Sequence, residues 1–206
     1  MPKLKLTYFD FDGGRGEPAR LALHLGGIAF EDRRIPFKDW DAHRDAMPFR
    51  ALPVLEVEGT VVSQSNSINR YVGKLAGLYP EDELQALLCD EVMDAIEDMD
   101  TPIGNTMDLP AEAKKKAREK LAAGLIPHYL GQIAARLAAA GGEYFADRRL
   151  TVGDLKVWMM VRWLRSGVLD YMPKDLVDGV APVLVKHAAC LAAHPQIAAY
   201  YAGRKK

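Results

Sequence analysis

The hydrophobic pattern of the chain changes near residue 80, and this change limits the folds that the chain can adopt. Before residue 80, short runs with a period of two residues, such as residues 3–9, are separated by glycine and proline, as expected of strands and turns. From residue 84 to residue 99, apolar residues recur at spacings of three and four, which is the pattern of an amphipathic helix. The sequence therefore predicts a small α/β unit followed by an all-helical one.

The first unit is predicted to run in the order strand, helix, strand, gap, hairpin and helix. Pro18 suits the first turn of a helix that Gly26 ends, and Glu58-Gly59 between two apolar runs indicates a hairpin. Glycine and proline cluster at residues 77–80, so the predicted domains are residues 1–79 and residues 80–206. We expect strands at residues 3–9, 30–35, 53–57 and 60–62, and helices at residues 17–25 and 65–75.

The second unit is predicted to be helical throughout. Residues 111–140 are rich in Ala, Lys and Leu and are predicted to form one long helix that Pro127 bends. Thr151 and Asp154 have the spacing of a capping box, so we expect Asp154 to be structural rather than catalytic. Further helices are predicted after residue 81 and at residues 151–165, 183–193 and 197–202.

Composition narrows the class of protein. The 27 Lys and Arg residues nearly balance the 28 Asp and Glu residues, which gives no electrostatic reason to expect a nucleic acid or a membrane as partner. No apolar run reaches the ~18 residues of a membrane-spanning helix, and residues 1–9 lack the apolar core of a signal peptide. Cys89 and Cys190 match no disulfide framework and no CxxC pattern, so the expected location is the cytoplasm.

The common catalytic signatures are absent from the sequence, which contains no GxSxG, P-loop, HExxH or GxGxxG motif. The five histidines form no i, i+4 pair, so no metal-binding motif is recognised, and we expect no resident cofactor.

Three local features remain, and each has an ordinary structural alternative. Tyr8 ends the first strand beside a glycine-rich loop, but it also fits a plain core tyrosine. The Leu52-Pro53 bond precedes a strand and is a candidate for a cis peptide, although only ~5% of such bonds are cis. Gln64-Ser65 begins a helix whose free N–H groups suit a carboxylate, while Ser65 also fits a simple N-cap.

Together and in this order, these features resemble the cytosolic glutathione S-transferases, most closely the sigma class. The resemblance implies an N-terminal thioredoxin-like βαβ-ββα domain followed by an all-helical domain. It extends over essentially the whole chain, through the stretches Lys5–Phe9, Arg15–Glu17, Glu31–Ile35, Trp40, Pro48-Phe49, Leu52–Val57, Gln64-Ser65, Ile68–Tyr71, Asp90, Asp94, Asp98 and Thr151–Asp154.

The resemblance assigns the catalytic role to Tyr8. A free thiol has a pKa of ~8.5, and only its thiolate attacks electrophiles well; a hydroxyl that hydrogen-bonds the sulfur favours the charged form. Arg15 matches the arginine that supports this hydroxyl, although the loop before it is one residue longer than in the sigma pattern. Glutathione is thus implied as co-substrate.

The resemblance also implies the contacts that hold glutathione. Leu52, before a cis Pro53, would bond the cysteinyl backbone, and Gln64 with Ser65 would hold the γ-glutamyl carboxylate. The remaining implied contacts are Trp40 and Arg44 at the glycyl end and Asp98, which would reach the γ-glutamyl amine across a homodimer interface.

The acidic residues of the predicted helix after residue 81 support such an interface. Asp90, Asp94 and Glu97 fall on one stripe, with Asp98 at its edge. Like charges gathered on one face repel each other, so we expect a partner's arginine, a ligand amine or a metal to reduce the repulsion between these carboxylates. Family resemblance makes Arg70 a candidate cross-interface partner.

The predicted function is conjugation of glutathione to electrophilic small molecules. A glutathione-dependent isomerase or peroxidase, and a non-catalytic ligand-binding or crystallin-like relative, stay open, although Tyr8, Gln64 and Ser65 together favour an enzyme. The second substrate is expected between residues 9–14, residues 103–107 and the start of the helix at residue 151. Asn105 stands where prostaglandin-isomerising relatives carry tryptophan, which counts against that activity.

Overall fold

A four-stranded mixed sheet forms the N-terminal half of the computed structural model, which describes residues 1–204. The strand order is β2-β1-β3-β4; β1 runs parallel to β2 and antiparallel to β3, and β3 pairs antiparallel with β4. The strands are β1 (Leu4–Phe9), β2 (Glu31–Ile35), β3 (Val54–Val57) and β4 (Thr60–Ser63). Every predicted strand is confirmed, and no strand bound differs from its prediction by more than one residue.

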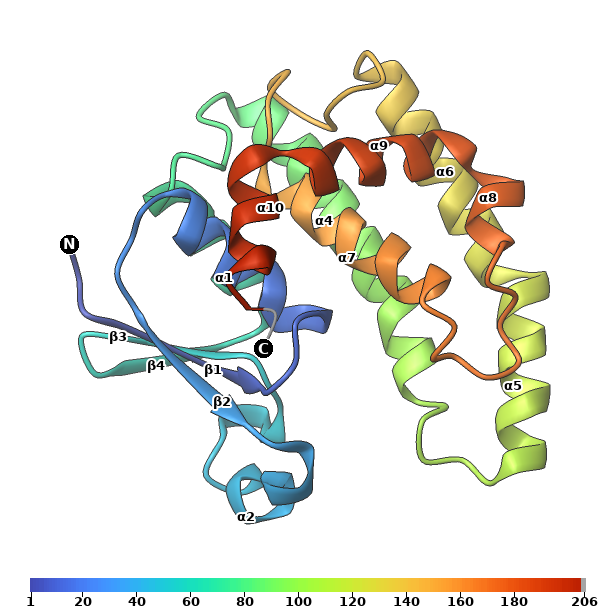
Figure 1. Cartoon of the computed structure of the whole chain (residues 1–206), viewed down its shortest axis with the longest axis horizontal. Helices are drawn as coiled ribbons and strands as arrows, with labels where there is room; N and C mark the ends of the chain where they lie inside the picture. Colours follow the sequence, from blue (N-terminus) through green and yellow to red (C-terminus); the bar gives the residue numbers. More distant parts are fainter. Residues whose placement is uncertain (205–206) are drawn as a thin grey trace.

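Two helices of this half, α1 (Glu17–Leu25) and α3 (Ser65–Leu75), pack against each other beside the sheet (Figure 1). The segment between β2 and β3, which the sequence left as a gap, contains the short helix α2 (Trp40–Arg44). Three-residue 3-10 turns are found at η1 (Gly14–Gly16), η2 (Phe37–Asp39) and η3 (Pro48–Arg50). The cis Leu52-Pro53 bond lies between η3 and β3.

The C-terminal half is entirely helical among the described residues, so the predicted architecture is confirmed. Its central helix is α7, in which every residue from Val152 to Val161 is buried, and α4 packs along it (Figure 1). Thr151 and Asp154 form the predicted capping box at the start of α7. The helices are α4 (Glu83–Gly104), α5 (Ala111–Ala123), α6 (Leu125–Ala139), α7 (Val152–Arg165), α8 (Leu176–Val180), α9 (Pro182–Ala193) and α10 (Pro195–Ala202).

One expectation about these helices is wrong. The stretch 111–140 is not a single helix bent at Pro127, because it divides into α5 and α6 at Gly124, whose φ of -132° and ψ of -84° are not helical. Pro127 is the third residue of α6, where the missing N–H of proline breaks no intrahelical hydrogen bond. The chain therefore turns at the glycine, and the proline is accommodated in the new first turn.

The two halves meet along α1, α3, α4 and α7. The C-terminal helix α10 returns to pack on α1 (Figure 1). No described helix is long and apolar enough to cross a membrane. The domain boundary between residues 79 and 80 stays a prediction.

Candidate active site

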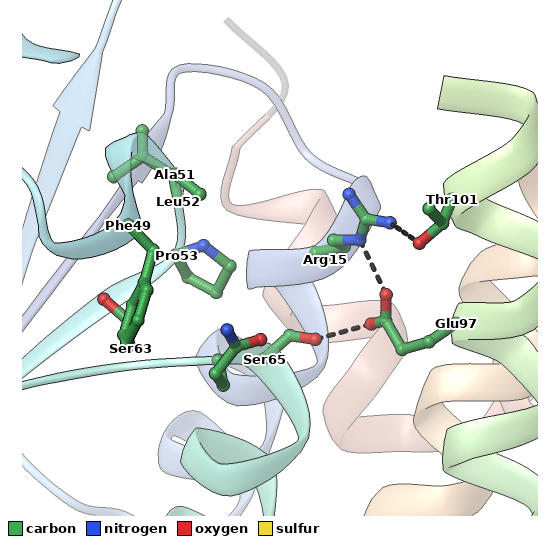
Figure 2. A pocket seen from close by; sticks show the side chains of 10 residues that line it. Arg15, Phe49, Ala51, Leu52, Pro53, Ser63, Ser65, Glu97 and Thr101 are labelled. Atoms are coloured by element: carbon green, nitrogen blue, oxygen red, sulfur yellow. Dashed lines mark hydrogen bonds and ion pairs between the residues drawn. The ribbon is translucent and has the colours of Figure 1, made fainter. Parts of the chain in front are cut away.

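A cavity of about 190 Å³ opens where the loop before β3 and the start of α3 face α4 (Figure 2). Its floor and walls come from four separate segments, so the cavity exists only because the two halves pack together. It is lined by Arg15, Phe49, Ala51, Leu52, Pro53, Ser63, Gln64, Ser65, Glu97 and Thr101. Five of the predicted site residues, Arg15, Leu52, Pro53, Gln64 and Ser65, are therefore brought together here.

Tyr8 is buried at the end of β1, next to this group rather than in the cavity lining. Its hydroxyl oxygen accepts the backbone N–H of Arg15 at 3.0 Å. Burial raises the pKa of Tyr8 above its ordinary value, so the hydroxyl keeps its proton at neutral pH. The oxygen accepts this hydrogen bond, and the hydroxyl proton remains available as a donor.

The Tyr8 side chain leaves no room for other side chains at two positions of the loop after β1, so glycine is required there. Gly14 has a φ of 65°, and a Cβ atom built there would lie 2.5 Å from the Tyr8 hydroxyl oxygen. A Cβ at Gly16 would collide with the Tyr8 ring itself. Residues with side chains at these positions would therefore displace the hydroxyl.

Arg20 binds the backbone of the same loop. This residue was not identified from the sequence. Its guanidinium is fully buried and donates to the carbonyl oxygens of Phe9 at 3.1 Å and Phe11 at 3.0 Å. Glu17 at 3.2 Å and Asp32 at 2.8 Å balance its charge. The i, i+3 spacing of Glu17 and Arg20 was the available signal, but it does not reveal the two carbonyl contacts.

The Arg15 side chain points toward α4 (Figure 2). Its Nε donates to Glu97 at 2.9 Å, and its Nη2 contacts Thr101 at 3.0 Å and Asp100 at 3.2 Å. In this structure Arg15 therefore supports the Tyr8 hydroxyl through its backbone N–H, while its guanidinium forms part of the cavity wall.

The start of α3 differs from a simple serine N-cap. Gln64 occupies the N-cap position with a φ of 78°, and its side chain caps nothing. Ser65 is the first helical residue and is buried. Its hydroxyl donates to Glu97 Oε1 at 2.5 Å and accepts from Lys156 Nζ at 3.1 Å (Figure 2). The N-cap alternative for Ser65 is therefore wrong.

Three carboxylates of α4 pair with cations of the same chain, where the sequence led us to expect a partner's arginine, a ligand amine or a metal. Asp90 and Asp94 bond Arg70 at 2.8 Å and 3.2 Å, so Arg70 is paired within its own chain, and its contact across an interface stays a prediction. Glu97 bonds Arg15 and Lys156. Sequence reasoning placed these acids correctly on one stripe, but it did not identify the cations that other elements bring to them.

Asp98 lies away from the cavity. Its side chain is exposed and accepts the hydroxyl of Tyr129 on α6 at 3.2 Å. Among residues 1–204, no three or more His, Cys, Asp or Glu side chains gather as metal ligands.

Trp40 and Arg44 lie together on α2, outside the cavity lining. The ring centroid of Trp40 is 5.3 Å from that of Phe9, in an edge-to-face arrangement. The exposed guanidinium of Arg44 lies 5.7 Å from the centroid of the Trp40 ring and pairs with Asp41 at 3.3 Å. An aromatic contact thus joins α2 to the end of β1, next to Tyr8.

The fold defines the class of protein. A thioredoxin-like N-terminal domain with this sheet topology is followed by an all-helical domain, and the cavity lies between them. Residues 16–75 match the family model "Glutathione S-transferase, N-terminal domain", and residues 97–204 match "Glutathione S-transferase, C-terminal domain". The chain therefore belongs to the glutathione S-transferase family.

Individual relatives agree with this assignment. The chain is 33% identical to glutathione S-transferase 1 of Ascaris suum over 180 residues, which cover 85% of this chain and 87% of that protein. It is 30% identical to the hematopoietic prostaglandin D synthase of Gallus gallus, covering 100% of this chain and 98% of that one. The solved structure of prostaglandin synthase D of Nilaparvata lugens is similar over the full length of both chains, with 32% identity and a TM-score of 0.87.

Proposed function

We propose that this protein binds glutathione in the cavity and joins its sulfur to electrophilic small molecules. One observation carries the proposal: Leu52, Pro53, Gln64, Ser65 and Arg15 line a single cavity. Tyr8 is bonded to the backbone of that same arginine, so the residues to which the resemblance assigns sulfur activation and glutathione binding form one group.

In the proposed complex, the backbone of Leu52 bonds the cysteinyl residue of glutathione as an added strand would. The γ-glutamyl carboxylate lies at the start of α3, where N–H groups and the helix dipole favour an anion. Trp40 and Arg44 approach the glycyl end. This arrangement directs the thiol toward the end of β1.

Tyr8 then donates its hydroxyl proton to the sulfur in a hydrogen bond, which stabilises the thiolate relative to the thiol. The thiol proton leaves to solvent, the sulfur lone pair forms a bond to the electrophilic carbon, and a leaving group departs with its bonding electrons. No resident cofactor takes part in this scheme.

The electrophile is proposed to lie between the loop after β1 and the end of α4. The start of α7, which the sequence also led us to expect there, is buried against α3 and the first half of α4. The ring centroid of Phe11 lies 5.7 Å from that of Tyr8, and Phe11 is 36% exposed. Met107, just after α4, is 42% exposed. Apolar side chains of this kind suit an apolar electrophile.

Binding to immobilised glutathione, followed by a panel of electrophiles, tests the proposal. We expect retention of the protein, elution by free glutathione and thioether formation with at least one electrophile. Failure to bind glutathione would contradict the proposal. Binding with turnover of only a peroxide or a prostaglandin precursor would favour the alternatives, and binding without any turnover would favour a ligand-binding protein.

Replacing Ser65 with alanine is expected to raise the KM for glutathione by roughly tenfold, with a smaller effect on kcat. The hydroxyl would contact the ligand equally in the ground state and the transition state, and loss of such a contact appears in KM. Steady-state kinetics at varied glutathione measures this split. Ser67→Ala, an exposed position on the same helix, is the matched control; a fall in kcat with KM unchanged would show instead that Ser65 acts on the sulfur.

We further propose that two copies associate through a face that includes one side of α4. At ~100° per residue, Leu84, Leu87, Asp94 and Asp98 share that side, and all four are exposed. Leu84 is 61% and Leu87 64% exposed, and Phe49 at the rim of the cavity is 78% exposed. Large exposed apolar side chains such as these favour burial against a second copy.

Sedimentation at micromolar concentration is expected to show a homodimer. The Asp98→Ala variant is expected to bind glutathione more weakly by ~1–3 kcal/mol, the range for loss of a charged hydrogen-bond partner. The reason is that Asp98 would reach the γ-glutamyl amine bound to the second copy. A fully active monomer would contradict the shared site. If the protein is a dimer but its Asp98→Ala variant binds glutathione normally, the proposed dimer stands and the proposed Asp98 contact is refuted.

The proposed location is the reducing cytoplasm, and the proposed role there is detoxification of electrophiles. Cys89 and Cys190 are both free, which suits such a compartment.

A further inference from the structure

A single lysine is buried in the middle of the apolar central helix. The Lys156 side chain on α7 is 2% exposed, and its neighbours Leu155 and Val157 are equally buried. Its ammonium bonds Glu97 Oε1 and Ser65 Oγ. Burial lowers the pKa of Lys156, and Glu97 opposes that shift. A buried lysine–carboxylate pair is generally no more stable than apolar residues of the same volume, so stability alone does not account for this residue.

Glu97 is the common partner of three donors at the cavity wall. Its Oε1 accepts from Lys156 and Ser65, and its Oε2 accepts from Arg15. These donors lower the pKa of Glu97 against the effect of burial, so Glu97 is ionised at neutral pH. A carboxylate thus lies directly beside the helix start where, on the proposed function, a second carboxylate binds.

We propose that Lys156 is a positioning residue that keeps the start of α3 able to accept the γ-glutamyl carboxylate of glutathione, an inference that rests on the function proposed above. In this structure the Ser65 hydroxyl donates to Glu97. When a ligand carboxylate arrives, the hydroxyl rotates to donate to it, and Glu97 Oε1 keeps Lys156 as its donor. The rotation therefore leaves no buried carboxylate oxygen unpaired, which would otherwise cost a full hydrogen bond.

Lys156 also makes the net charge around Ser65 zero rather than negative. The charged groups joined at this wall are Arg15 and Lys156 against Glu97 and Asp100. These four charges balance. Without the lysine, two carboxylates face one guanidinium, and the wall repels an incoming carboxylate across a partly desolvated cavity, where such interactions are strong.

Replacing Lys156 with methionine, an unbranched apolar side chain one atom shorter, is expected to raise the Kd for glutathione at least about tenfold. The kcat at saturating glutathione should change less than about threefold, because Tyr8 and its hydrogen bond to Arg15 are untouched. Lys186→Met, an exposed lysine on α9, removes one positive charge elsewhere and is expected to bind like the wild type. Calorimetric titration and steady-state kinetics provide the two readouts.

The double variant Lys156→Met with Glu97→Gln separates an electrostatic role from a packing role. It removes both members of the ion pair, so the negative charge left by the single variant disappears. We expect the double variant to bind glutathione more tightly than Lys156→Met does, a coupling that a double-mutant cycle measures. If Lys156→Met does not fold, Lys156→Gln replaces it, since glutamine retains a donor but carries no charge.

A ligand-side control identifies the group on which Lys156 acts. The tripeptide analogue with 4-aminobutyrate in place of the γ-glutamyl residue keeps the amine and the thiol but lacks the carboxylate. The wild type and the Lys156→Met variant are expected to bind this analogue with equal Kd. Equal losses for glutathione and the analogue, or no recovery in the double variant, would overturn the positioning role.

The outcomes also distinguish the two proposals. If the wild-type protein binds no glutathione, the proposed function fails. If the wild type binds glutathione and Lys156→Met binds it equally well, the role of Lys156 fails and the proposed function stands.

Discussion

Replacement of Tyr8 with phenylalanine is expected to lower the rate constant of glutathione conjugation by about tenfold or more at saturating glutathione, equivalent to ~1.4 kcal/mol in the activation barrier. The hydroxyl is buried and protonated, and its oxygen accepts the Arg15 N–H. On the proposed function this hydroxyl would stabilise the developing thiolate, and phenylalanine removes that donor while keeping the ring in the same space. Pre-steady-state or steady-state kinetics, under conditions in which chemistry limits turnover, measures the loss.

Glutathione affinity and the unfolding temperature serve as checks on this variant, and both should stay close to the wild type. Tyr171→Phe removes a hydroxyl from a residue that is 45% exposed and belongs to a loop outside the cavity, so its rate should not change. Unchanged turnover of Tyr8→Phe would remove Tyr8 from the mechanism.

The largest effect on stability is expected at Asp154. Replacement with alanine should lower the free energy of unfolding by roughly 3–5 kcal/mol, as for removal of one member of a buried polar network. The fully buried carboxylate accepts from the backbone N–H of Thr151 at 2.8 Å and its hydroxyl at 2.7 Å, and from the N–H of Phe145 at 3.1 Å. His187 Nε2 lies 3.0 Å from the same group. Alanine would leave these groups without their partner.

Urea unfolding monitored by tryptophan fluorescence measures this change. Asp108→Ala, at an exposed position after α4, is the matched control and should unfold within about 0.5 kcal/mol of the wild type. A loss below ~1 kcal/mol at Asp154 would show that the capping network is replaced by water or by neighbouring groups. Activity of the surviving folded fraction should be retained, because Asp154 touches no residue of the cavity lining.

The pattern of apolar residues predicted most of the secondary structure. The helix bounds at residues 17–25 and 65–75 agree with α1 and α3, and the hairpin around Glu58-Gly59 forms as expected. These elements are encoded within a few residues, by periodicity, by proline in a first turn and by glycine at an end. Where two local signals competed, in residues 111–140, the sequence did not show that Gly124 rather than Pro127 interrupts the helix.

The resemblance to a family identified the candidate residues, and packing decided which of them meet. Leu52, Gln64 and Ser65 were selected by motif, and they line one cavity. The acidic stripe of α4 was predicted as a set of repelling charges, yet Asp90, Asp94 and Glu97 are each paired with a cation from another element. The prediction considered one helix face without the helices that cover it.

By itself, the sequence determined the elements of this protein, the order in which they occur and the residues that carry the family motifs. Only the tertiary structure showed that Lys156 lies against Ser65 and Glu97, from which it is separated by 91 and 59 positions in the chain. The physical reason is that periodicity and capping act over a few residues along the backbone. An ion pair between α4 and α7 forms only when two separate helices pack, and a lysine in an apolar helix carries no local sign of the carboxylate that it will meet.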